Sequence, residues 1–304
     1  MNISMNAVTR RTAMRRTLFL SGGLSLPLPI TLRASGFEPF SFIVVSDTHL
    51  GRKDNDQAER QWRKTVADLA RADGDLVIHL GDVVDGGREE QYAIYLEERA
   101  KIGKPVHEIP GNHDPPDLFA RHIRPEIDTF LDHKGVRFVL LNNSRTDSHD
   151  GFFTESQLGW LDQLLTDAAE SGLRILLCIH VPVHPNRHPD RGWFVKPEHG
   201  QEKFYEVLDA HHGQVAGVFH GHFHNGIRGW DDRAPAHEVC FPSALYNGKR
   251  NLMEQGAPGY NLEEFRPCFT RVTIGTDAIE LVCHPIGESE PSESKLWKLV
   301  SQLK

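Results

Sequence analysis

The order of apolar and amphipathic segments constrains the fold more than any other feature of this chain. Short runs rich in β-branched and aromatic residues alternate with longer segments in which apolar residues recur at helical spacing. The strand-like runs of the first two-thirds are residues 40–45, 75–80, 105–109, 136–141, 174–179 and 215–219. The helix-like segments between them are residues 56–72, 88–101, part of 116–132, a segment that opens at Thr154, and 202–212. This alternation predicts an α/β domain with mostly parallel strands and with helices on the faces of the sheet.

The last third of the chain has a different pattern. Residues 236–241, 269–274 and 278–283 are strand-like with no helix between them, and Gly275-Thr276-Asp277 joins the last two as a hairpin-like turn. Residues 295–303 predict a short terminal helix. The predicted organisation is a leader over residues 1–36, a single domain over 37–286, and a tail or short helix over 287–304.

Residues 1–36 have the composition of an export signal. Arg15 and Arg16 precede Leu18-Phe19-Leu20, and a weakly apolar stretch follows as far as Leu32. The pattern resembles a bacterial twin-arginine signal, which implies export to the periplasm and contact with the membrane only during export. The apolar stretch is shorter than the roughly 20 residues that a membrane-spanning helix needs. A disordered basic N-terminus, which would leave the protein in the cytoplasm, and an uncleaved anchor are the alternatives.

The charge of the chain limits the partners that it can bind. Lys and Arg number 34 and Asp and Glu number 42, so the formal net charge is −8. Nucleic-acid binding depends on cationic side chains that release counterions from phosphates, so this acidic chain argues against general nucleic-acid binding. A small anionic substrate stays compatible with the charge, because bound metal cations would reverse the local field.

The four cysteines form no CxxC pair. Cys178 falls within the apolar run 174–179 and is predicted to be a buried thiol. Cys240 and Cys268 could form a disulfide in an oxidising compartment, but the spacing of cysteines in a sequence does not decide their pairing.

Five polar motifs each follow a strand-like run at the point where the run ends. They are Asp47-Thr48-His49, Gly81-Asp82-Val83-Val84-Asp85, Gly111-Asn112-His113-Asp114, His180 and Gly221-His222-Phe223-His224. Because ligands gather beyond the carboxyl ends of parallel strands, we expect these motifs to meet in one place. Their carboxylates, amide and imidazoles suit Fe, Mn, Zn or Co better than Ca. The motifs predict a site for two divalent or trivalent ions, which Asp82 could bridge with its two oxygens.

The motifs and their order resemble the calcineurin-like metallophosphoesterase family, whose pattern is D-x-H, G-D-x-x-D, G-N-H-[DE], a histidine after a strand, and G-H-x-H. The resemblance extends over about residues 41–285. It implies a four-layer α/β/β/α sandwich and hydrolysis of a phosphodiester or a phosphomonoester by a metal-activated hydroxide. The first and third motifs are similar to those of cyclic-nucleotide phosphodiesterases and glycerophosphodiesterases. His180-Val181-Pro182 departs from the His-His-Pro often found in that branch.

The resemblance also implies which side chains hold the metal ions. The first ion would be bound by Asp47, His49 and His224. The second ion would be bound by Asn112, His180 and His222. Asp82 would bridge the two ions, and Asp85 lies outside this ligand set.

The remaining implied roles concern the substrate. His113 would lie beside the substrate phosphate and assist the leaving group, and Asp114 would orient His113 by a hydrogen bond. The candidates for contact with the rest of the substrate are His184, His188 and Arg191, together with Trp193. A polar surface loop is the other interpretation of this segment. The rival function is a non-catalytic metal-binding scaffold with the same fold, and the complete ligand set together with His113 favours the enzyme.

Overall fold

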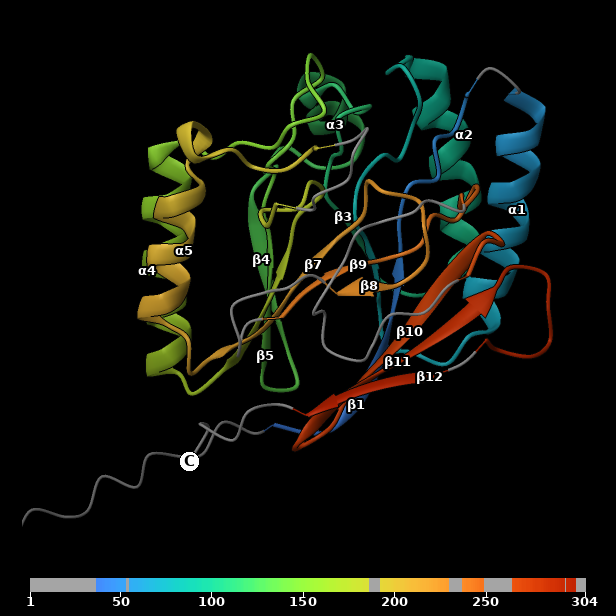
Figure 1. Ribbon diagram of the computed structural model, residues 1–304. Helices are drawn as coiled ribbons and strands as arrows, with labels where there is room; N and C mark the ends of the chain where they lie inside the picture. Colours follow the sequence, from blue (N-terminus) through green and yellow to red (C-terminus); the bar gives the residue numbers. More distant parts are fainter. Residues whose placement is uncertain are drawn as a thin grey trace, which may run out of the picture. The chain divides into compact units, whose positions relative to one another are not determined.

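The computed structural model describes residues 37–52, 55–185, 192–229, 237–248, 264–292 and 294–298. The leader over residues 1–36 and two candidate substrate contacts, His188 and Arg191, lie outside the described residues. The described residues belong to one unit, whose strands make two six-stranded sheets (Figure 1). Among the described residues, every helix is too short or too polar to cross a membrane.

The first sheet joins the beginning of the domain to its end. Its strand order is β12-β11-β10-β1-β2-β3. The strands are β1 (Phe40–Val45), β2 (Val77–His79), β3 (Val106–Glu108), β10 (Cys268–Ile274), β11 (Ala278–Pro285) and β12 (Ser294–Lys298). β1 pairs in parallel with β2, and it pairs antiparallel with β10. The sheet is therefore parallel where it carries the motifs and antiparallel where the C-terminal strands complete it.

The second sheet has the order β4-β5-β6-β7-β9-β8. The strands are β4 (Thr129–His133), β5 (Val136–Leu140), β6 (Arg174–Cys178), β7 (Val215–His220), β8 (Arg228–Gly229) and β9 (His237–Cys240). The four central strands are parallel, and the edge strands β4 and β8 are antiparallel to their neighbours. Every residue of β5, β6 and β7 is buried, as expected for parallel strands that are covered on both faces.

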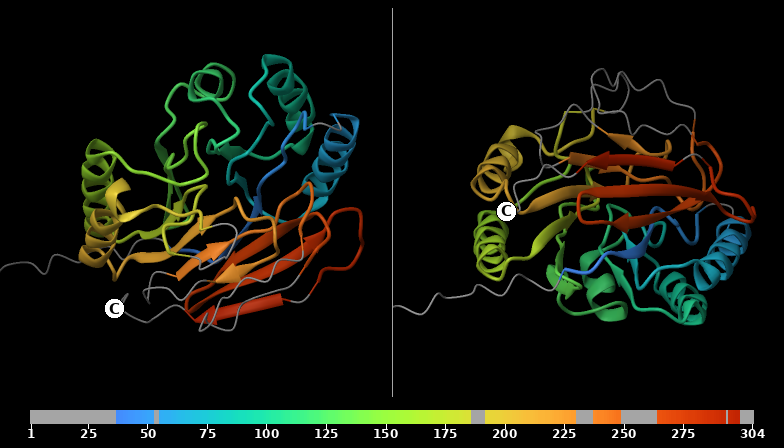
Figure 2. Two further views of the ribbon diagram at one scale, coloured as in Figure 1. Left: turned by 45° about the horizontal axis from the view of Figure 1, so that its top comes forward. Right: turned by 90° about the horizontal axis from the view of Figure 1, so that it is seen from below.

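Helices cover the outer face of each sheet, which gives four layers (Figure 1). The helices beside the first sheet are α1 (Asn55–Arg71), α2 (Glu89–Arg99), the 3₁₀ helix η1 (Ala100–Ile102) and α3 (Pro116–His122). The helices beside the second sheet are α4 (Glu155–Glu170), the 3₁₀ helix η2 (Pro197–His199) and α5 (Gln201–Ala210). Figure 2 shows the same layers from two further sides. The predicted α/β/β/α sandwich is confirmed.

The side chains of β1 alternate between its two faces, so this strand contributes to two apolar cores. Phe42 belongs to the apolar core between the sheets and packs edge-on against Phe138 of β5, with ring centroids 4.9 Å apart. Ile43 belongs to the core under the helices, together with Trp62 of α1 and Tyr92 of α2. Because successive side chains of a strand point to opposite faces, an apolar run such as that of β1 must be covered on both sides.

The start of α4 follows the sequence expectation. Thr154 precedes the helix and its Oγ1 accepts a hydrogen bond from the backbone N–H of Gln157 over 3.2 Å. The side-chain Oε1 of Gln157 in turn accepts the backbone N–H of Thr154 over 3.0 Å. This reciprocal pair satisfies two backbone donors that the first turn of a helix leaves open.

The segment 116–132, predicted to be helical in part, is helical only as far as His122 and then forms the edge strand β4. β4 pairs antiparallel with β5, and His133 lies opposite Val136. The two residues between them, Lys134 and Gly135, have φ angles of 45° and 83°, which is the backbone of a tight hairpin turn. The Lys-Gly pair is the sequence signal for this hairpin, and the prediction of a partly helical segment did not take it into account.

The predicted terminal helix over residues 295–303 is wrong for residues 295–298, and residues 299–303 lie outside the described residues. Residues Ser294–Lys298 form β12, which extends the first sheet by pairing with β11, with Trp297 opposite Ile279. The pairing needs only an open sheet edge and overrides the weak local preference of so short a segment.

The four cysteines are buried free thiols. Cys178 lies in β6, as the apolar run around it predicts. Cys240 lies in β9 of the second sheet and Cys268 in β10 of the first sheet, and the possible disulfide between them is absent.

Candidate metal centre

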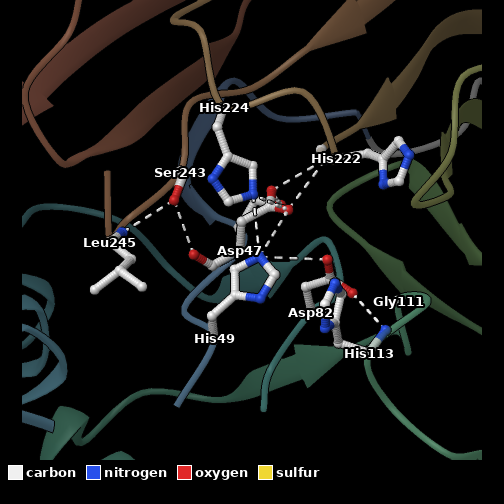
Figure 3. Close-up of polar contacts among 12 residues, drawn as sticks. Asp47, His49, Asp82, Gly111, His113, His222, His224, Ser243 and Leu245 are labelled. Atoms are coloured by element: carbon white, nitrogen blue, oxygen red, sulfur yellow. Dashed lines mark hydrogen bonds and ion pairs between the residues drawn. The ribbon is translucent and has the colours of Figure 1, made fainter. Parts of the chain in front are cut away.

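The five motifs leave the carboxyl ends of strands from both sheets and meet in one buried site, and Figure 3 shows residues of four of them. β1 leads to Asp47 and His49, β2 to Asp82, β3 to Asn112 and His113, β6 to His180, and β7 to His222 and His224. Each of the seven implied metal ligands has an exposed fraction of 8% or less. The structure therefore brings together residues that are far apart in the sequence.

Five of these residues have a left-handed backbone, which residues other than glycine rarely adopt. The φ angles are 55° at Asp47, 43° at His49, 52° at Asp82, 76° at His222 and 53° at His224. A left-handed residue turns the chain sharply where a strand ends. The side chains of Asp47, His49, Asp82 and His224 point toward one another (Figure 3), and Nδ1 of His222 faces His180. Backbone strain of this kind persists only where the surrounding structure enforces it, and it gathers at functional sites.

Two motif glycines let the turns approach one another closely. A Cβ atom on Gly111 would collide with the carboxylate and the backbone nitrogen of Asp82. A Cβ atom on Gly221 would collide with Oγ of Ser46 and would lie 2.5 Å from Oδ2 of Asp47. Glycine is required at both positions because any side chain would displace a carboxylate of the site.

A first group of ligand atoms comes from Asp47, His49, Asp82 and His224, and these atoms all lie within 4.8 Å of one another. Nε2 of His224 is 3.0 Å from Oδ1 of Asp47 and 3.1 Å from Nε2 of His49. Nε2 of His49 is 3.4 Å from Oδ2 of Asp82. Two imidazoles and two carboxylates thus converge on a single point.

A second group comes from Asp82, His180 and His222. Nε2 of His180 is 3.3 Å from Oδ2 of Asp82 and 3.2 Å from Nδ1 of His222. Asn112 lines the same cavity as Asp82 and His222, and its Oδ1 is buried without a hydrogen-bond partner among the described residues. A buried carbonyl oxygen without a partner is costly, and a cation would satisfy it.

Asp82 belongs to both groups through one oxygen atom. Its Oδ2 is the atom that approaches His49 and His180. Its other oxygen, Oδ1, accepts the backbone N–H of His113 over 2.9 Å. We expected the two oxygens to divide between two ions, whereas the structure turns a single oxygen toward both groups. The hydrogen bond to Oδ1 fixes this orientation.

Hydrogen bonds outside each group orient the imidazole rings. Nδ1 of His49 lies 3.1 Å from Oδ1 of Asp85, and Nδ1 of His180 lies 2.7 Å from the carbonyl oxygen of Leu80. An acceptor at Nδ1 keeps the proton on that nitrogen and leaves Nε2 with a lone pair toward the site. The rings of His49 and His180 are therefore set to bind a metal through Nε2.

The charges of the site favour a bound cation. Burial raises the pKa of Asp82, but His180 and His49 lower it more, so the pKa lies well below its ordinary value. Burial lowers the pKa of His222, and the neighbouring His180 lowers it further. Burial also lowers the pKa of His180, but Asp82 raises it more, to about 9. A cation at this site would replace the proton of His180 as the partner of the carboxylate, and ionised carboxylates with neutral imidazoles are the metal-binding forms.

Asp85, and not Asp114, makes the contact that we expected to orient His113. Nδ1 of His113 lies 3.0 Å from Oδ1 of Asp85. Asp114 is used differently, because its carboxylate accepts the backbone N–H groups of Val83, Val84 and Gly111 over 2.9–3.0 Å. The carboxylate of Asp114 therefore links the backbone of the second motif to the backbone of the third.

A cavity of about 400 Å³ opens over both groups. Its lining consists of His49, Arg52, Asp82, Asp85, Asn112, His113, His149, Trp193, His222, His224 and Tyr246. Trp193 was a candidate for substrate contact, whereas Arg52 and His149 carry no motif that would have singled them out. His184 is not among the described lining residues, and its backbone N–H donates to the carboxylate of Glu238 over 3.1 Å.

Ser243 supports the site from a loop after β9 that no motif predicted. Its Oγ donates to the backbone carbonyl of Asp47 over 2.9 Å and accepts the backbone N–H of Leu245 over 3.0 Å (Figure 3). A carbonyl in a left-handed turn has no regular strand partner, so this hydroxyl replaces one.

A match to a family model shows which protein family the chain belongs to. The family model described as calcineurin-like phosphoesterase matches residues 40–226, which contain all five motifs and more than half of the chain. The chain belongs to the calcineurin-like phosphoesterase family. The matched residues run from the first strand of the sandwich through the last implied ligand, His224.

Relatives of this calcineurin-like phosphoesterase include named phosphodiesterases. A probable glycerophosphodiester phosphodiesterase of Arcobacter nitrofigilis is 28% identical over 187 residues, which cover 55% of this chain and 65% of that protein, just under two thirds of its length. A 3',5'-cyclic-nucleotide phosphodiesterase of Nostoc is 25% identical over 241 residues, which cover 74% of this chain and 87% of that protein.

A solved structure has the same fold. A dimetal phosphatase from Danio rerio superposes with a TM-score of 0.64 at 17% sequence identity, covering 86% of this chain and 100% of that one. At this level of identity, the likeness extends to the fold of the calcineurin-like phosphoesterase and no further.

Proposed function

We propose that this calcineurin-like phosphoesterase hydrolyses phosphate esters with two metal ions. The observation that carries the proposal is the meeting of two ligand groups at one carboxylate oxygen, Oδ2 of Asp82. Relatives that are named as phosphodiesterases support the same reaction class. Asp47, His49 and His224 would hold the first ion, and Asn112, His180 and His222 the second.

The metal ions would supply positive charge that lowers the pKa of a water molecule and neutralises charge on the phosphate. His113 supplies a proton. Burial lowers the pKa of His113, but the hydrogen bond with Asp85 and the charge of Asp82 raise it more, so the ring keeps its proton to a higher pH. Because Asp85 holds Nδ1, the other ring nitrogen can give its proton to the leaving oxygen.

Metal reconstitution tests the function. Purified full chain loaded with manganese should hydrolyse bis(p-nitrophenyl) phosphate, and Asp82→Ala should lose both metal loading and turnover. His113→Ala should keep its metal and lose about 10²–10⁴-fold in kcat, the usual contribution of a general acid. If no turnover appears with manganese, iron, zinc or cobalt, the rival function of a non-catalytic metal-binding scaffold is supported instead.

The preferred substrate in this proposal is a small-molecule phosphodiester. Support comes from the two relatives, which are named as a glycerophosphodiester phosphodiesterase and a cyclic-nucleotide phosphodiesterase. The value of kcat/KM should be higher for bis(p-nitrophenyl) phosphate than for p-nitrophenyl phosphate. The opposite order would make the protein a phosphomonoesterase.

We also propose that the chain is exported to the periplasm. Arg15 and Arg16 before an apolar stretch support a twin-arginine signal and a periplasmic location. In a bacterial host, the full chain should reach the periplasmic fraction, and a variant with Arg15→Lys and Arg16→Lys should stay in the cytoplasm. Equal distribution of the two proteins would argue for a cytoplasmic enzyme.

A further inference from the structure

Two rings outside the motifs border the cavity beside the second ligand group. His149 and Trp193 stack with ring centroids 4.2 Å apart and planes 20° apart. The ring of Trp193 lies 5.2 Å from that of His222, and the ring of His149 lies 5.8 Å from it. The stacked pair therefore stands next to His222, where the second ion would bind.

His149 contacts the one amide among the implied ligands. Nδ2 of Asn112 and Nδ1 of His149 are 3.4 Å apart, which is a long hydrogen bond. The two ends of an amide differ, because Nδ2 can only donate and Oδ1 can only accept. Nδ1 of His149 must therefore be the acceptor. While it holds Nδ2, the opposite end of the amide turns away from His149.

The opposite end of this amide is the atom that a cation needs. Oδ1 of Asn112 is buried and has no hydrogen-bond partner in the described part of the chain. Hard cations bind the oxygen of an amide, whereas its NH₂ group presents hydrogens that a cation repels. The direction in which this amide points thus decides whether Asn112 attracts or repels the second ion.

The ring pair is fastened in place by the loops that carry it. His149 lies in the loop before α4, and Trp193 lies in the loop before η2. Beside the rings, Oδ1 of Asp150 lies 3.4 Å from Nζ of Lys196, which ties the two loops together. Stacking on the indole restricts rotation of the imidazole, so its Nδ1 stays directed at Asn112.

We propose that His149, held by Trp193, is a positioning residue that turns the carbonyl oxygen of Asn112 toward the second metal ion. The inference rests on the proposed dinuclear centre and assigns a role to two residues outside its ligands. Without the acceptor, the amide can rotate and present Nδ2 to the ion. Contacts that orient a ligand in this way typically support about 10–100-fold of metal affinity.

Titration of the metal-free full chain with manganese, followed by calorimetry, tests this role without any measurement of activity. In His149→Ala the first ion should bind as in the wild type and the second about 10–100-fold more weakly. His149→Gln should recover part of the loss, because its amide oxygen can accept from Nδ2. The matched control is His211→Ala, which removes a histidine that contacts Asp162. This control should bind both ions normally.

Variants of Trp193 separate the ring stack from the hydrogen bond. Trp193→Phe keeps an aromatic face for His149 and should bind both ions normally, whereas Trp193→Ala should weaken the second ion alone. His149 is exposed, so its replacement leaves the apolar core intact.

Two outcomes would overturn the positioning role. The first is wild-type affinity for both ions in His149→Ala, and the second is equal weakening of both ions, which would indicate a general structural effect. A wild-type protein that binds a single ion would refute the dinuclear centre itself, and this result is distinct from either of the others.

Discussion

At the scale of single residues, the metal centre depends on backbone positions as much as on ligands. Its left-handed turns and close glycine contacts hold Asp82 and Asp47 in orientations that an ordinary strand end would not give. The strain of each such residue costs on the order of 1–3 kcal/mol and must be offset by the packing around it. A substitution at a motif glycine should therefore weaken metal binding although every ligand residue is unchanged.

Gly111→Ala should strongly reduce metal binding. The added Cβ would occupy the position of the Asp82 carboxylate, and so the bridging oxygen must move. Metal content after dialysis against manganese measures the effect. Gly159→Ala is the matched control, because its Cβ would meet no atom within 4 Å in the interior of α4. This variant should keep both ions, and its free energy of unfolding should be about 0.5–1 kcal/mol higher than that of the wild type. Normal metal content in Gly111→Ala would contradict the assigned contact.

Asp85→Asn and Asp114→Asn should separate catalysis from stability. Asp85→Asn removes the charge beside His113, so kcat at saturating manganese should fall by about 10–100-fold with little change in unfolding. Asp114→Asn weakens the acceptor of three backbone N–H groups and should lower the free energy of unfolding by about 1–3 kcal/mol while kcat stays close to wild type. Equal losses of kcat in both variants would mean that the two carboxylates share one role.

The sequence predicts the metal ligands well, but it predicts poorly the residues that orient them and hold their backbone. The order of the five motifs indicates every implied ligand, because each motif follows an apolar run whose strand character is clear. It does not indicate that Asp85 contacts His113, since side-chain direction in a left-handed turn depends on the packing of neighbouring loops. Ser243 and His149 lie outside any motif, and only the folded chain brings them to the site.

At the scale of elements, local signals decide where helices start and neighbouring strands decide where edge strands form. The capping pair of Thr154 and Gln157 is visible in the sequence because both partners are close together. β12 is not visible, because its formation depends on the open edge of β11. β4 likewise depends on its pairing with a neighbouring strand, β5, although the Lys-Gly turn between the two strands is a local signal in the sequence.

The segment that enters β10 should give stability that depends on pH. Hydrogen bonds from Arg266 to Glu264, 2.8 and 2.9 Å long, lower the pKa of this carboxyl from 4.5 to about 2. A lowered pKa in the folded state stabilises the protein above pH 4.5, and this contribution is lost as the pH falls from 4.5 to about 2. The difference in unfolding free energy between the wild type and Glu264→Gln should therefore be constant at neutral pH and shrink in acid.

Urea unfolding between pH 7 and pH 3 measures this difference. Arg266→Gln should show the same pH dependence, and the double variant should add little to either change, because the two side chains act as a pair. A difference that stays constant down to pH 3 would show that the ion pair contributes nothing.

At the scale of the whole domain, the metal centre joins the two sheets. Asp47, His49, Asp82 and Asn112 come from strands of the first sheet, and His180, His222 and His224 come from strands of the second. Bound ions would therefore join two layers that also share an apolar core and polar contacts such as the hydrogen bond between Nδ1 of His180 and the carbonyl oxygen of Leu80.

Removal of the metal should lower the thermal midpoint of the domain as a whole. Manganese at 100 times its dissociation constant should add about 2.7 kcal/mol to the free energy of unfolding, because it binds the folded state alone. Calorimetry before and after treatment with a chelator measures the change. Asp82→Ala should unfold at the same temperature with and without manganese, and a metal-dependent midpoint in this variant would contradict the bridging role of Asp82.

The position of β1 has a consequence for synthesis of the chain. β1 emerges first from the ribosome, yet it pairs on one side with β10, which begins at Cys268. Until that late segment is translated, one side of β1 carries backbone groups with no strand to bind them, and such an edge can recruit other chains. A nascent chain halted after Tyr246 would be prone to aggregate even though every motif residue had already been made.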